Sequence, residues 1–215
     1  MKVLVWCATA EDCRVFEQYN KGRIEFEYTP DTLTEENVSS CKGYEGIVIQ
    51  TRCIITEKVA ALLAEAGVKF IACRSAGFDH VNLAAIKKYG IKACNVPLYS
   101  PNAIAEYAVM ASMMALRKVK KQLHMTEKGD YTLKGLRGQE LRDQTIGIIG
   151  TGRIGMESLK IFSSFTKDIL LYDPYPREDA KAMGTYVSLD EIYEKSTLLV
   201  FSLSFYKRKF PYGKW

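Results

Sequence analysis

A glycine-rich segment, Gly147–Gly155, constrains the fold of this 215-residue chain more than any other feature. It begins as an apolar run that is typical of a buried strand. Its last six residues have the spacing G-x-G-x-x-G, which joins a strand to a helix in dinucleotide-binding folds. We expect Gly150 to allow the tight turn, Gly152 to let the backbone approach a pyrophosphate, and Gly155 to bring the helix close to the sheet.

A second strand with an acidic end makes the glycine segment more specific. The apolar run Ile169–Tyr172 ends in Asp173, which lies 18 residues after Gly155. A carboxylate at this position can accept hydrogen bonds from the ribose of an adenosine. Because no basic residue occupies the strand end, we expect NAD rather than NADP as the cofactor. The alternative is a glycine turn without a ligand. The predicted cofactor-binding residues are Gly150, Gly152, Arg153, Ile154, Gly155 and Asp173.

The composition argues against several other classes of protein. Apolar residues make up 47% of the chain and charged residues 26%, as in ordinary globular proteins. The apolar start, Met1–Cys7, is too short for a signal peptide or a membrane span, so we expect a first strand and a cytoplasmic protein without membrane contact. The six cysteines include no C-x-x-C pair, and only two histidines accompany them. Neither a metal site nor a disulfide framework is therefore indicated.

The net charge of +5 does not indicate a nucleic-acid-binding protein. Lys207, Arg208, Lys209 and Lys214 lie in the segment 197–215, which contains no acidic residue. Without these four, 26 basic residues face 25 acidic ones. The basic character thus belongs to the end of the chain and is no general property of its surface.

The first hundred residues alternate short strands with helices, which predicts a parallel sheet covered on both faces. The expected strands are Lys2–Cys7, Ile24–Tyr28, Gly46–Gln50, Lys69–Cys73 and Lys92–Asn95. The expected helices are Glu11–Asn20, Thr56–Ala66 with Thr56 as the cap, and Leu83–Tyr89.

The second half begins with a strongly apolar segment, Asn102–Lys121, which we expect to form one long helix that needs cover on more than one side. A polar connection, His124–Gln144, then leads into the glycine-rich strand. Beyond Asp173 the expected elements are a short helix at Arg177–Met183, a helix opened by a capping box at Ser188 and running through Lys195, and a strand at Thr197–Phe205. Tyr206–Trp215 shows no period.

Two further segments carry specific motifs. Residues 74–82 read RSAGFDHVN, and residues 95–106 read NVPLYSPNAIAE. Together with the glycine turn and Asp173, they resemble the D-isomer-specific 2-hydroxyacid dehydrogenase family, in its D-lactate dehydrogenase and (R)-2-hydroxyglutarate dehydrogenase branch, over residues 1–196. This resemblance implies NADH-dependent reduction of a 2-oxo acid, such as pyruvate, to the D-2-hydroxy acid. It also implies a flavodoxin-like substrate domain at 1–100 and an incomplete Rossmann dinucleotide-binding domain at 101–196, followed by a divergent segment at 197–215.

The resemblance assigns substrate-binding roles to residues that follow the predicted strands. Small residues at Ser75, Ala76 and Gly77 leave backbone N–H groups open to a carboxylate, and Tyr99 would line the pocket. The alternatives are a plain turn glycine and a packed aromatic ring. We hypothesise that Arg52 pairs with the second carboxylate of a dicarboxylic substrate such as 2-oxoglutarate. A surface arginine with a local acidic partner is the other reading.

The chain is expected to contain none of the catalytic residues of the family. There a histidine held by a carboxylate donates a proton to the carbonyl oxygen, while an arginine polarises it, and the resemblance places all three groups beyond residue 215. We interpret His80 as part of the turn next to Asp79, and His124 as a cation at a helix end. The family also implies a homodimer, with an isologous interface along residues 102–121.

Departure from the family pattern begins at Thr197, where the expected Asp and the His-x-Pro loop are absent. Loss of one base would convert a coding sequence for Ser-Asp-Ile-Ile into Ser-Thr-Leu-Leu, and an out-of-frame continuation would follow; the encoding DNA tests this hypothesis. We expect such a chain to be inactive, marginally stable and aggregation-prone. The alternative is a catalytically silent NAD(H)-binding protein that acts as a redox-sensing partner.

Overall fold

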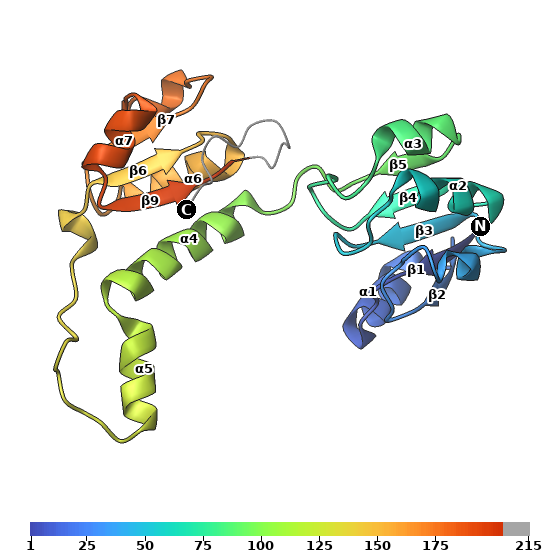
Figure 1. Cartoon of the computed structure of the whole chain (residues 1–215), viewed down its shortest axis with the longest axis horizontal. Coiled ribbons are helices and arrows are strands. Elements are labelled where there is room, and N and C mark those ends of the chain that lie inside the picture. Colours follow the sequence, from blue (N-terminus) through green and yellow to red (C-terminus); the bar gives the residue numbers. More distant parts are fainter. Residues whose placement is uncertain (204–215) are drawn as a thin grey trace. The chain divides into compact units, whose positions relative to one another are not determined.

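The computed structural model describes residues 1–203, and the chain divides into two compact units between Tyr99 and Ser100 (Figure 1). Each unit is an α/β assembly with a parallel sheet of its own, so the predicted fold class is confirmed. The predictions for residues 204–215 lie outside the described residues. No helix within residues 1–203 is both long enough and apolar enough to cross a membrane.

The first unit contains five parallel strands in the order β2-β1-β3-β4-β5, which is the order of flavodoxin-like folds. The strands are β1 (Lys2–Val5), β2 (Glu25–Tyr28), β3 (Gly46–Ile49), β4 (Phe70–Cys73) and β5 (Lys92–Cys94). The helices are α1 (Ala10–Asn20), α2 (Glu57–Glu65) and α3 (Leu83–Lys88), and a 3-10 turn occupies Val38–Cys41. All the strands and helices predicted for this half are present, with ends that differ by one or two residues.

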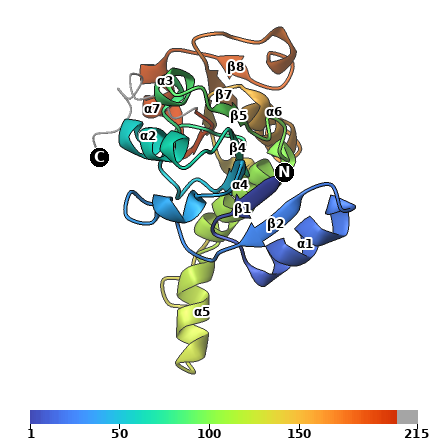
Figure 2. The same cartoon turned by 90° about the vertical axis from the view of Figure 1, so that its right-hand side faces the viewer.

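Successive side chains along the strands of this unit point to opposite faces of the sheet, and each face has its own hydrophobic core. Leu4 and Trp6 belong to the larger core, which also contains residues of α2 and α3. Val3 and Val5 point to the other face, where they pack with side chains of α1. Figure 2 shows α1 and α2 on opposite sides of the sheet. The prediction of a sheet covered on both faces is therefore confirmed only in part. On the α1 face, Phe70 of β4 is 42% exposed and all three residues of β5 are exposed.

The second unit has a four-stranded parallel sheet in the order β8-β7-β6-β9. Its elements are α4 (Pro101–Leu116), α5 (Val119–Glu127), a 3-10 turn at Leu141–Asp143, β6 (Ile146–Ile149), α6 (Arg153–Phe162), β7 (Ile169–Tyr172), a 3-10 turn at Glu178–Ala180, β8 (Thr185–Tyr186), α7 (Leu189–Lys195) and β9 (Leu198–Phe201). Numbered from β6, this is the order 3-2-1-4 with which a Rossmann sheet begins. The strand that follows α7 thus extends the sheet, and its Val200 is buried in the core.

Two predictions for this half were wrong in detail. The expected single helix over Asn102–Lys121 is two helices, because Lys118 adopts a left-handed conformation with φ of 55° and the chain changes direction there. The break coincides with the end of the apolar stripe at Leu116, and α5 buries none of its residues. The short helix expected at Arg177–Met183 is reduced to a 3-10 turn, and the two-residue strand β8 that follows it was not predicted.

The core of the second unit joins α4, α6 and three strands. Leu159 and Phe162 of α6 are fully buried against Ile146 and Ile148 of β6, and α4 packs along the outer side of α6. On the other face of the sheet, Gly147 leaves room for α7: a Cβ atom at this position would lie 2.3 Å from Ser196 Oγ. The glycine-rich strand is therefore enclosed from both sides.

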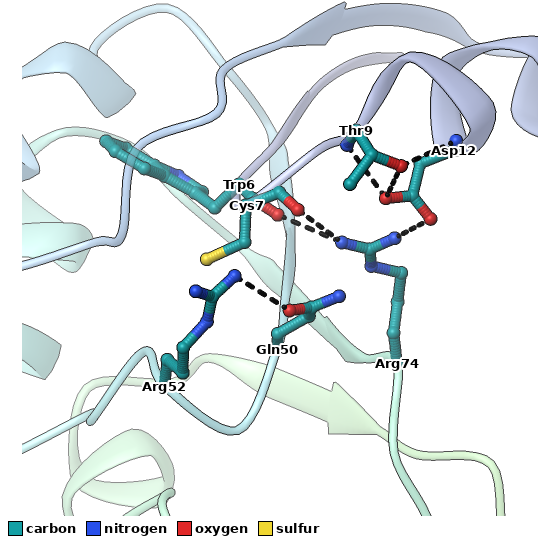
Figure 3. A network of polar contacts seen from close by, with 7 residues as sticks. All are labelled: Trp6, Cys7, Thr9, Asp12, Gln50, Arg52 and Arg74. Atoms are coloured by element: carbon teal, nitrogen blue, oxygen red, sulfur yellow. Dashed lines mark hydrogen bonds and ion pairs between the residues drawn. The ribbon is translucent and has the colours of Figure 1, made fainter. Parts of the chain in front are cut away.

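A half-buried arginine ties together the loops at the carboxyl ends of β1 and β4 (Figure 3). Arg74 Nη1 donates to Asp12 Oδ1 at 2.6 Å, and Arg74 Nη2 donates to the carbonyl oxygens of Trp6 and Cys7 at 3.2 and 3.1 Å. Asp12 also accepts the backbone N–H of Thr9, which caps α1 reciprocally. The first residue of the RSAGFDHVN motif thus anchors the β1–α1 loop.

Acid should weaken this anchor. Burial raises the pKa of Asp12, but the hydrogen bonds from the Thr9 backbone and hydroxyl and the pairing with Arg74 outweigh it and lower the pKa below its ordinary value. A group whose pKa is lower in the folded state contributes stability above its unfolded pKa of about 3.9 and loses that contribution as the pH falls through the folded value.

We therefore expect Asp12→Asn to reduce the free energy of opening of β1 and β4 at neutral pH by about 1–3 kcal/mol, and to flatten the additional loss below about pH 4. Amide hydrogen exchange in these strands measures both effects. The control is Glu11→Gln, since the Glu11 side chain is 79% exposed in the same helical turn. Equal acid sensitivity in the wild-type and Asp12→Asn chains would contradict the prediction.

Candidate functional site

The turn between β6 and α6 has the geometry expected of a dinucleotide-binding loop. Gly150 has φ of +97°, and its N–H donates to Tyr172 O at 2.8 Å. A Cβ atom on Gly155 would lie only 1.9 Å from Gly150 O, so the helix can begin here only if this residue is glycine. At Gly152, by contrast, no heavy atom of the described residues would lie within 4 Å of a Cβ. Within residues 1–203, the space in front of Gly152 is open.

The amino-terminal end of α6 faces this open space. Gly152 is the N-cap and has no side chain to accept the first N–H groups of the helix. Arg153 is exposed and Ile154 is half-buried in the first turn. Free N–H groups, the helix dipole and an adjacent guanidinium all favour an anion at this end. These residues suit a pyrophosphate.

Asp173 lies at the end of β7, beside the same turn. Its Oδ2 atom accepts the Thr151 N–H at 2.7 Å and the Thr151 hydroxyl at 3.3 Å, and its Oδ1 atom accepts the Tyr175 N–H at 2.9 Å. The Thr151 hydroxyl also lies 2.7 Å from the hydroxyl of Tyr186, which comes from β8. The structure thus brings Gly150, Gly152, Gly155 and Asp173 to the carboxyl ends of neighbouring strands β6 and β7.

The loop after β4 offers backbone donors to a carboxylate. Ser75 Oγ donates to Gly77 O at 2.7 Å, and Asn95 Nδ2 donates to Ala76 O at 2.7 Å, so two carbonyl groups of the loop are engaged. Within residues 1–203, the backbone N–H groups of Ala76 and Gly77 donate to no backbone carbonyl. Both residues are exposed. Fixed carbonyls together with free N–H groups suit an anionic ligand.

Tyr99 and Arg52 complete the predicted substrate-binding residues of the first unit. Tyr99 is 70% exposed, which excludes the packed-aromatic alternative in the described chain. Arg52 follows β3 and is exposed; its Nη2 atom donates to Gln50 Oε1 at 3.4 Å. In the part of the chain that the structure describes, Arg52 makes no ion pair, so the local acidic partner of the alternative reading is not found. In the view of Figure 3, Gln50 lies between the guanidinium groups of Arg52 and Arg74.

The contacts of His80 favour a turn role over an acid–base role. Burial lowers the pKa of His80, which the charge of Asp79 only partly offsets, and its Nε2 atom is buried without a hydrogen-bond partner. The His80 carbonyl accepts the Ile55 N–H at 2.8 Å, as expected for a residue that shapes a turn. His124 lies in the last turn of α5.

The thiols are free and show no metal-binding arrangement. Cys7 and Cys53 lie with their sulfur atoms 3.6 Å apart in the core, and burial raises the pKa of Cys53. Within residues 1–203, no group of three or more His, Cys, Asp or Glu side chains could hold a metal ion.

Sequence reasoning did not identify Thr151 and Tyr186 in the second unit, or Arg74 and Asp12 in the first. Thr151 occupies a variable position of the G-x-G-x-x-G spacing, and Tyr186 lies in a strand too short to give a periodic signal. The Arg74–Asp12 pair joins residues 62 positions apart, and no local pattern indicates such a contact.

Comparison with known proteins places this geometry in a family. The sequence model described as "D-isomer specific 2-hydroxyacid dehydrogenase, catalytic domain" matches residues 3–202. A D-2-hydroxyacid dehydrogenase (NAD(+)) from Clostridioides difficile is 38% identical over 204 residues, which cover 93% of this chain and 61% of the relative. The chain spans about 60% of the length of the curated relatives it matches.

Solved structures agree. The apo-structure of D-lactate dehydrogenase from Escherichia coli has a TM-score of 0.85 at 32% identity and covers 96% of this chain, which spans 66% of that chain. D-lactate dehydrogenase from Aquifex aeolicus complexed with NAD and lactic acid has a TM-score of 0.82 at 28% identity, with 95% and 61% covered. The Clostridioides difficile relative and the Aquifex aeolicus structure carry NAD in their names, in agreement with the predicted cofactor. The chain belongs to the D-isomer-specific 2-hydroxyacid dehydrogenase family.

Proposed function

We propose that this chain binds NAD(H) and a 2-oxo acid as part of an NAD-dependent (R)-2-hydroxyacid dehydrogenase that reduces pyruvate or a similar substrate to the D-2-hydroxy acid. The observation that carries the proposal is the contrast between the second and third glycines of the turn. Gly155 is closed by contact with Gly150, whereas Gly152 has open space before it in the part of the chain that the structure describes. A glycine in open space with φ of −66° is required neither by its backbone conformation nor by packing. The approach of a ligand explains it.

Each proposed role follows from the contacts around the residue. The first turn of α6, with Arg153, holds the pyrophosphate, and Asp173 holds the adenosine ribose. The N–H groups of Ala76 and Gly77 hold the carboxylate of the 2-oxo acid, with Ser75 and Tyr99 at the same pocket. Bound NADH supplies the hydride that the carbonyl carbon receives. The residues described here bind and orient the two molecules.

Proton delivery is a separate requirement, and we infer that His80 does not meet it. Burial lowers the pKa of His80, and its Nε2 atom is enclosed and cannot hand a proton to a ligand. This observation favours a second candidate, a catalytically silent NAD(H)-binding protein with a redox-sensing role. The six free cysteines suit a reducing compartment, and we propose a cytoplasmic location.

Two glycine variants test the proposal. We expect Gly152→Ala to keep the thermal midpoint of the wild-type chain but to weaken NADH binding at least ten-fold, because the added methyl group occupies the space proposed for the pyrophosphate. Gly155→Ala should lower both the midpoint and the affinity, because its Cβ would overlap Gly150 O. NADH fluorescence and thermal unfolding are measured on the same samples.

The same samples are mixed with pyruvate, and NADH oxidation is followed. Binding without oxidation is expected of the 215-residue chain. Oxidation well above background would show that His80 or another group delivers the proton. Wild-type affinity in Gly152→Ala would contradict the proposed cofactor site.

Arg52 offers a test of substrate class. If it binds a second carboxylate, Arg52→Ala should weaken 2-oxoglutarate binding about three- to ten-fold and leave pyruvate binding unchanged, because pyruvate has only one carboxylate. Ligand-observed NMR with NADH present measures both affinities. The control is Arg14→Ala, whose side chain is 73% exposed on α1. An unchanged ratio of the two affinities would rule out this role.

We also propose a homodimer formed along α4. Tyr107, Met110 and Met114 lie on the side of α4 opposite its buried residues and are 67%, 46% and 38% exposed. An apolar row of this kind on one helix can pair with itself around a two-fold axis. Met110→Asp should therefore shift sedimentation velocity from dimer to monomer. Tyr19→Asp, at a 71% exposed position on α1, should not. A monomeric wild-type chain would refute the dimer.

A further inference from the structure

We propose that Tyr186 is a positioning residue that fixes the carboxylate of Asp173 for the adenosine ribose, and so sets the preference of the site for NADH over NADPH. The inference deepens the proposed NAD(H) binding and rests on it. No motif in the sequence indicates a role for Tyr186. Its hydroxyl reaches the glycine turn from the edge strand β8.

The hydrogen bonds around Tyr186 form a chain with one direction. The backbone N–H of Arg177 donates to the Tyr186 oxygen at 3.0 Å. At the other end, the Asp173 carboxylate only accepts, and the Thr151 hydroxyl lies 3.3 Å from it. If the Thr151 proton points to Asp173, the Tyr186 proton must serve the 2.7 Å contact between the two hydroxyl groups. The order of donation is Arg177 N–H, Tyr186 O–H, Thr151 O–H and then Asp173. Each bond in such a chain polarises the next.

This chain leaves Asp173 with capacity for a ligand. An ionised carboxylate has about four lone-pair sites. Two of them, on Oδ2, are used by Thr151, and one, on Oδ1, is used by the Tyr175 N–H. The carboxylate cannot rotate without breaking these bonds. Its remaining acceptor site therefore has a fixed direction, which is what a specific bond to a ribose hydroxyl requires.

The charge of Asp173 is also left uncompensated. Within residues 1–203 it makes no ion pair. The neighbouring cation, Arg177, is held by Asp179 through two bonds, from Nε at 2.9 Å and from Nη2 at 2.6 Å. An arginine near this position can accommodate the 2′-phosphate of NADP. Here the guanidinium is already paired, and the fixed carboxylate repels a phosphate.

The position of Tyr186 is set by its backbone. Tyr186 pairs with Leu171 of β7, and the following residue, Val187, donates to Leu171 O at 3.0 Å. Just before β8, a Cβ atom on Gly184 would lie 3.0 Å from Ile169 O, so the chain approaches β7 closely here. The half-buried ring is thus held by an edge strand of only two residues. Presenting Tyr186 to the turn is the role that we assign to that strand.

The test compares Tyr186→Phe with the wild-type chain by titration with NADH and with NADPH. We expect NADH to bind about three- to ten-fold more weakly and the NADH-to-NADPH affinity ratio to fall by a similar factor, because the Thr151 hydroxyl is no longer held toward Asp173 and one of the three groups that orient the carboxylate is lost. Thr151→Val should have the same effect, and the double variant should add little, since both residues belong to one chain of bonds. The control is Tyr193→Phe, at a 40% exposed position on α7.

Making Tyr186→Phe in the Asp173→Asn variant distinguishes a positioning role of Tyr186 from a merely structural one. There Tyr186→Phe should no longer change the affinity ratio, whereas loss of stability alone would weaken both coenzymes equally in either background. The inference fails, and the proposed function stands, if the wild-type chain binds NADH, if Asp173→Asn weakens that binding, and if Tyr186→Phe leaves it unchanged. Absence of NADH binding by the wild-type chain would overturn both.

Discussion

The close backbone approach between Gly155 and the Gly150 carbonyl determines how the rest of the second unit is arranged. A Cβ atom at residue 155 would overlap that carbonyl, so α6 can start directly at the end of β6 only because both residues are glycine. The approach brings the amino terminus of α6 to the carboxyl edge of the sheet, where Asp173 ends the neighbouring strand. The burial of Leu159 and Phe162 beneath β6 then holds the helix in this position. This short sequence motif thereby places the partial positive charge of the helix terminus and a carboxylate beside the space in front of Gly152.

In the first unit a side chain, and not a glycine contact, holds the loops at the carboxyl ends of the strands together. Its loops after β1 and β4 carry no equivalent glycine contact, and the guanidinium of Arg74 joins them through Asp12 and two carbonyl groups. A guanidinium suits this task because its planar set of donors can serve three acceptors at once. The loop that follows, Ser75–Gly77, has its carbonyls engaged by Ser75 and Asn95 and its exposed N–H groups left over. The hydrogen bonds to its carbonyl groups hold the loop in one conformation, and in that conformation the N–H groups of Ala76 and Gly77 remain available to a ligand.

The sequence predicted what depends on local periodicity and on glycine. Strands of buried residues, the caps at Thr56 and Ser188, and the turn at Gly150 all appear where the residues indicate them. Errors arose where a competing constraint had no local signal. The apolar stripe of α4 suggested continuation to Lys121, but a left-handed residue at Lys118 ends it. Equally, the Tyr186 contact links residues 35 positions apart through a strand of two residues, so neither pattern nor propensity could indicate it.

The partner of Arg177 shows why coenzyme preference needs more than a motif. A reader of the sequence sees an arginine four residues after Asp173 and could infer a site for a 2′-phosphate. In the folded chain Asp179 binds that guanidinium with two hydrogen bonds, and the backbone N–H of the same arginine serves Tyr186. Arg177 therefore contributes its backbone N–H to the hydrogen bonds that fix the Asp173 carboxylate, while its guanidinium pairs with Asp179. The negative charge at the end of β7 remains, which supports the proposal that this end receives a ribose with free hydroxyl groups.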